Sequence, residues 1–179
     1  MQINQQHWLE PVRALNSPFY NQRPSEEISL LVIHCISLPE GQFGLSYIDD
    51  LFTGCLDCQA DASFAELQGL QVSAHLLINR LGEVTQYVPF NLRAWHAGVS
   101  SFAGREGCND FSIGIELEGC DSQGYSEAQY QALVEVSQVL LKRYPLLNKQ
   151  RIVAHSDIAP SRKTDPGPFF DWPRYLAAL

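Results

Sequence analysis

The sequence lacks both a run of basic residues and a long hydrophobic run. Its 179 residues include 12 Lys and Arg against 20 Asp and Glu, which gives a formal net charge of −8 at pH 7. This charge disfavours a polyanionic partner, so we expect no nucleic acid to bind. No apolar stretch approaches the roughly 20 residues that span a bilayer. We therefore expect no membrane partner either.

The start of the chain also lacks the features of a secretory leader. Residues 1–10 are polar, without the basic start and apolar core of a signal peptide. The five cysteines agree with the cytoplasmic location that this predicts, because their odd number excludes complete internal pairing and free thiols persist in reducing compartments. Cys55 and Cys58 form a close pair, but no second close pair completes a structural zinc site. We interpret all five as structural thiols.

What remains is ordinary globular material, with 45% hydrophobic and 18% charged residues. This length is typical of a single domain, and no repeat or linker divides the chain. Apolar runs of strand length alternate with helical patterns. We predict one α/β domain over residues 1–179, with a mixed central β-sheet flanked by helices. Residues 1–27 are polar and contain three prolines, so we expect them to form an irregular wrapping arm.

Several segments carry clear secondary-structure patterns. Residues 28–33 are a near-continuous apolar run, typical of a buried central strand. Residues 73–78 and 83–88 predict a β-hairpin. A helix should run from Ser126, which forms a capping box with Gln129, to Tyr144. Short helices are expected near two further segments, Ser63–Glu66 with its own capping-box spacing and residues 173–178.

Two histidines share a distinctive position at the ends of apolar runs. His34 follows residues 30–33, and His155 follows residues 151–154. Residues at strand ends are held by a rigid scaffold and face a cleft, where metal and catalytic groups are usually placed. Asp165 lies ten residues after His155 in a polar loop. We interpret the three as one ligand set with an open position, the pattern of a catalytic zinc.

A carboxylate in a predicted strand is a second candidate. Residues 112–118 alternate, so that Glu116 lies on the opposite face from Ile113 and Ile115 and beside the small Gly114. This face suits a cleft better than a packed core. By itself, the pattern leaves open whether Glu116 is catalytic or an ordinary exposed strand residue.

Residues 91–110 are the longest irregular segment, and long ordered loops in compact domains are usually functional. His96 lies within it, next to Trp95. We place His96 at the rim of the pocket, either as a substrate contact or as a donor to a metal ligand. Of the other histidines, His75 is interpreted as structural and His7 as a surface residue.

The ordered series of motifs along the chain resembles the zinc-dependent N-acetylmuramoyl-L-alanine amidases of the amidase-2 family. Within that family it is most similar to the cytosolic peptidoglycan-recycling branch. The motifs are Leu31-Val-Ile-His34, Val72-Ser-Ala-His75, Arg93-Ala-Trp-His-Ala-Gly98, Asn109 to Gly119, His155-Ser-Asp-Ile-Ala-Pro160 and Lys163-Thr-Asp-Pro-Gly167. Two positions depart from the family pattern: Cys35 replaces a polar residue, and Gly107 stands where an Arg is expected.

The resemblance implies a role for each candidate residue. It implies that His34, His155 and Asp165 bind one zinc ion per chain, and that Glu116 and Lys163 are catalytic. It also implies the substrate, a small muropeptide cleaved between 1,6-anhydro-N-acetylmuramic acid and L-alanine. Zinc would activate water and polarise the carbonyl, Glu116 would transfer the proton, and the Lys163 ammonium would stabilise the oxyanion.

Substrate contacts are predicted from the long loop and from nearby cations. The loop offers Trp95, His96, Asn109 and Asp110. Because the protein is acidic, local cations must hold the stem-peptide carboxylates, and a bidentate Arg suits them best. We assign this role to Arg105 or Arg162.

Two alternatives remain open at this stage. One is a peptidoglycan-binding module on the same fold that has lost catalysis, although such modules usually lack one of the ligands. The other is a periplasmic amidase that acts on intact murein. No feature of the sequence indicates an obligate protein partner.

Overall fold

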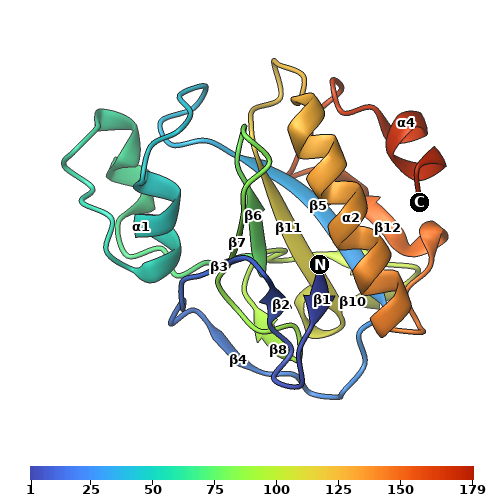
Figure 1. Ribbon diagram of the computed structural model, residues 1–179. Coiled ribbons are helices and arrows are strands. Elements are labelled where there is room, and N and C mark those ends of the chain that lie inside the picture. The colour runs from blue at the N-terminus through green and yellow to red at the C-terminus, as the bar shows by residue number, and fades with distance from the viewer.

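The computed structural model describes residues 1–179 and builds them around one six-stranded sheet (Figure 1). The first four strands across this sheet are parallel, β7 runs antiparallel to β6, and β3 runs parallel to β7. The mixed central sheet expected from the sequence is confirmed. In spatial order the strands are β12 (Ile152–Ala154), β5 (Leu30–Ile36), β11 (Ser112–Glu118), β6 (Leu76–Ile78), β7 (Val84–Gln86) and β3 (Arg13–Ala14).

Shorter elements surround this sheet. Three two-stranded pairs are formed by β1 (Gln2–Ile3) with β2 (Leu9–Glu10), β4 (Tyr20–Gln22) with β8 (Leu92–Ala94), and β9 (Ser101–Phe102) with β10 (Arg105–Glu106). The helices are α1 (Tyr47–Thr53), α2 (Glu127–Arg143), α3 (His155–Ile158) and α4 (Trp172–Ala177), with 3₁₀ turns η1 (Ala62–Leu67), η2 (Cys108–Asp110) and η3 (Lys149–Arg151).

The two faces of the sheet have different roles. Helix α2 lies across one face (Figure 1), where Leu31 and Ile33 of β5 share the main hydrophobic core with Leu133. Side chains alternate along a strand. His34 on β5 and Glu116 on β11 are partners in the parallel register, so both project to the face away from α2. The functional candidates therefore share one side of the sheet.

Helix α2 begins and ends where the sequence predicts. The Ser126 hydroxyl accepts a hydrogen bond from the Gln129 backbone N–H, and the Gln129 side chain accepts one from the Ser126 N–H, a complete capping box. Lys142 and Arg143 lie in the last turn, where they complement the helix dipole. The predicted hairpin, β6 with β7, is also confirmed.

The environments of the two histidines differ from the expectation. Strand β5 continues two residues beyond His34 to Ile36, because its ladder with β11 continues to the pair Ile36–Glu118. His34 is thus inside a strand and not at its end. His155 does follow β12 directly, but it opens the single-turn helix α3 where a loop was expected.

Two smaller predictions also need correction. The arm over residues 1–27 is less irregular than expected, since Arg13 and Ala14 add strand β3 to the edge of the sheet. The turn η1 is capped by Asp61, whose carboxylate accepts from the Ser63 N–H, and not by Ser63 itself. A carboxylate two residues upstream satisfies the free N–H as well as the predicted hydroxyl would.

The segment with α1 and η1 extends to one side of the sheet in Figure 1. Leu51 and Phe52 of α1 turn inward, where they are buried against Tyr87 and Val88 in a second hydrophobic cluster. This segment supplies part of the apolar wall of the cavity described below. No helix in the chain combines the length and the hydropathy needed to cross a membrane.

Candidate active site and metal centre

Three potential ligand atoms converge on the sheet face opposite α2. His34 Nδ1 lies 2.9 Å from His155 Nδ1, and Asp165 Oδ2 lies 3.1 Å from each of these nitrogens. Both imidazoles are buried, while Asp165 is partly exposed. The fold brings together residues that are 121 and 131 positions apart in sequence. It thus assembles the ligand set predicted from the sequence.

The hydrogen bonds around this cluster test whether a cation fits there. His155 Nε2 lies 3.1 Å from the carbonyl oxygen of Ala97, which only accepts, so this nitrogen carries the proton and Nδ1 presents a lone pair. Asp165 adds a third electron-rich atom. Atoms that bind a tetrahedral zinc at about 2.0–2.2 Å lie roughly 3.3 Å apart. The observed separations, and a donor set of two nitrogens and one oxygen, fit such an ion.

The charge state of the cluster points the same way. Burial lowers the pKa of His34 to about 4, so the ring is neutral near pH 7. Burial raises the pKa of Asp165, but the adjacent His155 and His34 nitrogens outweigh it and leave the pKa below its ordinary value. His34 is therefore a neutral imidazole and Asp165 a carboxylate, the ionisation states that a divalent metal requires of these ligands.

Glu116 lies beside His34 on the neighbouring strand. Its side chain is buried, and its Oε2 atom has no hydrogen-bond partner. Burial and the nearby Asp165 raise the pKa of Glu116 well above its usual range, against the opposing effect of Lys163. A buried carboxyl atom without a partner is costly to maintain, which is typical of a group that serves a reaction.

A cavity of about 270 Å³ joins these groups. Glu116, Lys163, Trp95 and His96 line it together with the three ligands, and its opposite wall is apolar. The wall residues are Ile36, Leu38, Leu51, Phe52, Leu67, Leu70, Val72 and Ala74. Lys163 Nζ forms no hydrogen bond or ion pair within the chain, so its ammonium is free to act on a ligand in this cavity.

A second hollow of about 380 Å³ adjoins the first. Cys35, Ile36, Lys163 and Asp165 line both, so the two spaces meet at Asp165, whereas His34 and His155 line only the first. The second hollow is more polar and includes Arg162 and Thr164 in its lining. Together they form a groove with an apolar half, which contains the ligand cluster, and a polar half, which joins it at Lys163 and Asp165.

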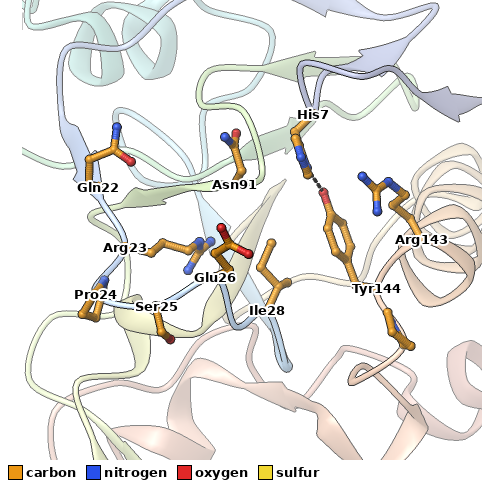
Figure 2. Close-up of a pocket in the computed structure, with 11 residues that line it drawn as sticks. His7, Gln22, Arg23, Pro24, Ser25, Glu26, Ile28, Asn91, Arg143 and Tyr144 are labelled. Carbon is orange, nitrogen blue, oxygen red and sulfur yellow. Dashed lines mark hydrogen bonds between the residues drawn. The ribbon is translucent and has the colours of Figure 1, made fainter.

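A larger cavity, about 680 Å³, lies elsewhere, between the arm and the end of α2 (Figure 2). Arg23 lines it, but its guanidinium donates to the carbonyl oxygens of Phe90, Asn109 and Ser112. Its hydrogen-bonding capacity is thus used inside the protein. We locate the active site in the smaller cavity, because that one contains the ligand cluster and the unpartnered carboxylate.

The residues predicted to contact substrate do not all reach the groove. Trp95 and His96 line the cavity, as expected. Asn109 is buried behind the loop, where its Oδ1 atom accepts hydrogen bonds from the backbone N–H groups of His96 and Ala97. Asp110 forms an ion pair with Arg93, 2.5 Å between Oδ1 and Nε. Neither Asn109 nor Asp110 lines either hollow.

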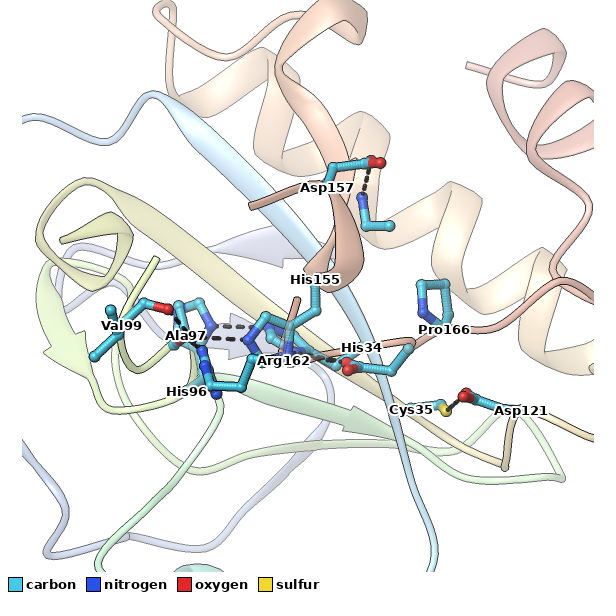
Figure 3. Close-up of polar contacts among 12 residues, drawn as sticks. His34, Cys35, His96, Ala97, Val99, Asp121, His155, Asp157, Arg162 and Pro166 are labelled. Carbon is cyan, nitrogen blue, oxygen red and sulfur yellow. Dashed lines mark hydrogen bonds and ion pairs between the residues drawn. The ribbon is translucent and has the colours of Figure 1, made fainter. Parts of the chain in front are cut away.

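The two candidate arginines also differ. Arg105 forms an ion pair with Glu27 and stacks on the Phe111 ring, away from both hollows. Arg162 lines the polar hollow, yet its guanidinium donates to the carbonyl oxygens of Ala97 and Val99 at 2.6 and 2.8 Å (Figure 3). Of the two, only Arg162 lines the groove.

Some functional groups leave no signal in the sequence. The Ala97 carbonyl supports His155, and the Ser112 hydroxyl lies 3.1 Å from His96 Nε2. The apolar wall from Leu51 to Leu70 comes from a segment whose pattern indicates only a short helix. A backbone carbonyl carries no side-chain signature, so its role appears only once the fold is known.

Comparisons with known proteins agree with this site. A family model described as N-acetylmuramoyl-L-alanine amidase matches residues 24–168. The chain is 58% identical over 172 residues to the 1,6-anhydro-N-acetylmuramyl-L-alanine amidase AmpD of Escherichia coli, covering 96% of this chain and 93% of that protein. It superposes on a crystal structure of selenomethionine AmpD with a TM-score of 0.97 at 54% identity, over 100% and 99% of the two chains.

A more distant structure contains a substrate. The amidase AmiD of E. coli, in complex with anhydro-N-acetylmuramic acid-L-Ala-D-γ-Glu-L-Lys, is 34% identical with a TM-score of 0.63. The match covers 88% of this chain and 60% of that one.

Proposed function

Because the chain belongs to the N-acetylmuramoyl-L-alanine amidase family, we propose that it hydrolyses the amide bond between 1,6-anhydro-N-acetylmuramic acid and L-alanine in peptidoglycan recycling. The observation that carries this proposal is the convergence of His34, His155 and Asp165 beside an unpartnered Glu116 in one cavity. The high identity to AmpD supports the choice of substrate.

The metal in this proposal is one zinc ion per chain, held by His34, His155 and Asp165. When bound there, zinc supplies Lewis acidity, which acidifies water and polarises a carbonyl at neutral pH. Two neutral imidazoles and one carboxylate leave the site a net positive charge, which preserves that acidity. Every other part of the reaction is assigned to the chain's own residues.

Glu116 acts as the proton carrier. As water attacks the lactyl carbonyl carbon, its proton passes to the Glu116 carboxylate. Glu116 then delivers this proton to the alanine nitrogen while the C–N bond breaks. A carboxyl whose pKa is raised by burial is suited to both steps, because it accepts a proton more readily than an exposed carboxylate and can still release it to a more basic amine nitrogen.

Lys163 stabilises the charge that develops on the carbonyl oxygen. Its ammonium lines the same cavity and has no partner within the protein. A preorganised donor in a water-poor site contributes about 3 kcal/mol to transition-state stabilisation. The lysine therefore has a larger effect here than it would on an open surface.

The groove suggests how the substrate lies across the site. We assign the sugar to the apolar cavity that Trp95 lines, and the peptide to the polar hollow that Arg162 lines. The scissile amide then falls at the ligand cluster between them. In this arrangement Arg162 would contact a peptide carboxylate, whereas Arg105, Asn109 and Asp110 would act indirectly.

We place this activity in the cytoplasm, on soluble wall fragments. The five cysteines, an odd number, support a reducing compartment. A small groove that closes around one sugar and its peptide also suits a fragment better than a polymer. No observation favours a non-catalytic binding module, since all three ligands and Glu116 are present and assembled.

Product analysis tests the proposal. The zinc-loaded protein is incubated separately with an anhydromuropeptide, with the matching peptide on ordinary N-acetylmuramic acid, and with intact murein, and the products are identified by mass spectrometry. We expect free peptide and anhydro-sugar from the first, and much slower release from the other two. Preferred release from intact murein would favour the periplasmic alternative, and no release from any substrate would refute the amidase assignment.

A further inference from the structure

We propose that Asn109, together with His96 and Ser112, is a positioning set that orients both imidazole ligands from outside the metal site. This inference rests on the proposed zinc site, since it concerns how that site is held. Asn109 thereby has a role other than the substrate contact expected from the sequence, and His96 has the ligand-supporting role, one of the two that the sequence left open. Four sets of hydrogen bonds connect these residues to the two ligands.

The first set supports His34. Its Nε2 atom lies 2.9 Å from His96 Nδ1, and His96 Nε2 lies 3.1 Å from Ser112 Oγ. With Nδ1 of His34 directed at the metal, its Nε2–H donates to His96, and the Nε2–H of His96 donates to the Ser112 hydroxyl. The chain of bonds has one consistent direction. It fixes the His34 tautomer that leaves Nδ1 free for the metal.

The position of the His96 ring is itself tightly specified. Its plane is nearly perpendicular to that of His34, at 86°. The ring packs directly on Gly114 of β11, where an added Cβ atom would lie only 2.5 Å from the ring. Only glycine leaves room for the ring at this point. The small residue noted in the strand beside Glu116 is thus explained by the histidine that lies on it.

The second set supports His155. Its Nε2 atom donates to the Ala97 carbonyl oxygen at 3.1 Å, which fixes the corresponding tautomer of this ligand (Figure 3). Ala97 directly follows His96. The two ligands, which come from opposite ends of the chain, therefore receive their outer hydrogen bonds from two consecutive residues of one loop.

The third set holds that loop in place. Asn109 Oδ1 accepts from the His96 N–H at 3.1 Å and from the Ala97 N–H at 2.8 Å. One amide oxygen thus fixes the backbone of both supporting residues. Asn109 is only 7% exposed, so water cannot easily replace this acceptor.

The fourth set fixes Asn109 and Ser112 from behind. The partly buried Arg23 guanidinium donates to the carbonyl oxygens of both residues, at 3.1 and 2.7 Å. The supporting atoms therefore have little freedom to relax. Removing the Asn109 oxygen would leave two buried N–H groups unpaired and release both ligand supports together.

The consequence for metal binding has a known scale. Outer hydrogen-bond partners orient metal-binding histidines and raise their basicity, and their mutation typically costs 10- to 100-fold in metal affinity. We expect Asn109→Ala to weaken zinc binding by about this factor. Asn109→Asp keeps an oxygen that accepts both N–H groups, so its affinity should return close to that of the wild type.

The test measures zinc affinity by competition with a chromophoric chelator, together with kcat, KM and the absorption spectrum of the cobalt-substituted protein. Asn79→Ala is the matched control, because the Asn79 Oδ1 atom also accepts two backbone N–H groups, from Leu81 and Glu83, away from the metal. We expect Asn79→Ala to keep zinc affinity and the cobalt spectrum. Asn109→Ala should change both and lower kcat more than it raises KM.

A second variant guards against misfolding of Asn109→Ala. Ser112→Ala removes only the hydroxyl that fixes the His96 ring, and we expect a smaller loss of zinc affinity with an altered cobalt spectrum. Unchanged zinc affinity in both Asn109→Ala and Ser112→Ala, with a raised KM instead, would overturn the inference in favour of substrate contact. If the wild type itself binds no zinc, the proposed function fails instead, and the two outcomes are thereby distinguished.

Discussion

The active site joins two regions that are built in different ways. His34 and Glu116 lie on β5 and β11, adjacent parallel strands whose register is unbroken over seven residue pairs. Asp165 and Lys163 lie in the irregular segment after α3. We call these the strand side and the loop side of the site. One side is fixed by a backbone ladder, and the other depends on separate tethers.

Those tethers are single hydrogen bonds, among them the two from the Arg162 guanidinium to the Ala97 and Val99 carbonyl oxygens. The Ser156 N–H donates to the Asp165 carbonyl at 3.1 Å, and the Lys163 N–H donates to the Ala159 carbonyl at 2.9 Å. From outside the segment, the Tyr125 hydroxyl donates to the Pro166 carbonyl at 2.6 Å.

The difference predicts two kinds of response to mutation. The backbone of a strand-side residue cannot move without breaking the hydrogen-bond ladder. When the reactive side chain is removed, no backbone movement can therefore bring another group into its place. A tether on the loop side contributes only one hydrogen bond, about 1 kcal/mol. Its removal should therefore produce a graded loss.

The largest effect is expected on the strand side, from Glu116→Gln. The amide has the same shape but takes up no proton, so turnover should fall by about 100- to 10,000-fold. Zinc should remain stoichiometric, because Glu116 is not a ligand. Steady-state kinetics and metal analysis on the same sample check both expectations.

Glu118→Gln is the matched control for this prediction. Glu118 is also buried on β11, two residues further along, but its carboxylate accepts from the backbone N–H groups of Gly44 and Arg80. This variant should lose stability and keep activity within about tenfold of the wild type. Equal turnover losses in the two variants would show that Glu116 acts through structure and not through proton transfer.

The next effect is expected on the loop side, from Lys163→Met. Loss of the ammonium removes charge stabilisation from the oxyanion, so kcat should fall by about 100- to 1,000-fold with little change in KM. Lys149→Met, at a lysine that caps the Leu176 carbonyl far from the groove, is the control. A Lys163→Met enzyme with normal kcat would remove this residue from the mechanism.

The stability of the sheet beneath the strand side should also depend on pH, because His75 lies beside β11. Burial lowers the pKa of His75 well below its ordinary value, and its Nδ1 accepts the Gly114 N–H of β11. The unfolded chain therefore binds a proton below about pH 6.5 that the folded chain does not. The stability from this histidine is complete above that pH and decreases as the pH falls, by up to about 1.4 kcal/mol per pH unit.

Urea unfolding of the metal-free protein between pH 7.5 and 5.5 measures this dependence. His75→Gln is less stable at pH 7.5, but its free energy of unfolding should fall less steeply with acid. Parallel pH profiles for the variant and the wild type would show that His75 does not contribute in this way.

The smallest effect is expected from a loop-side tether, Tyr125→Phe. Losing the hydrogen bond to Pro166 loosens the segment that carries Asp165, so activity should fall by less than about tenfold. Tyr175→Phe, whose hydroxyl bonds Ser137 in the core at 2.6 Å, is the control that loses stability and keeps activity. If Tyr125→Phe lost as much activity as Lys163→Met, the expectation that removing a tether causes only a graded loss would be wrong.

The same two regions show which features of the site could be predicted from the sequence. On the strand side, the apolar run before His34 and the alternation around Glu116 each predict a strand. Hydrophobic periodicity also specifies which face of such a strand packs into the core. That alternation does not say that β5 and β11 are neighbours, which depends on the whole sheet order. The length of β5 beyond His34 was likewise set by its partner strand.

The supporting loop was harder to interpret. In the sequence Asn109 looks like a substrate contact, and His96 looks like either a substrate contact or a donor to a metal ligand, because polar residues in a long loop are often functional. The hydrogen bonds from the His96 and Ala97 N–H groups to Asn109, and from His34 to His96, arise only when the fold brings these residues together. The ligand set itself was predicted as three residues, but their convergence within 3.1 Å is a property of the structure alone.

The central claim is that the strand side and the loop side meet at one zinc ion, and metal content tests it most directly. Zinc is measured per chain in the purified protein, after chelation, and after zinc is added back, with amidase activity followed at each step. We predict one zinc per chain, loss of activity and a lower Tm on removal, and recovery of both on restoration. Full amidase activity in protein shown to be free of metal would contradict the account.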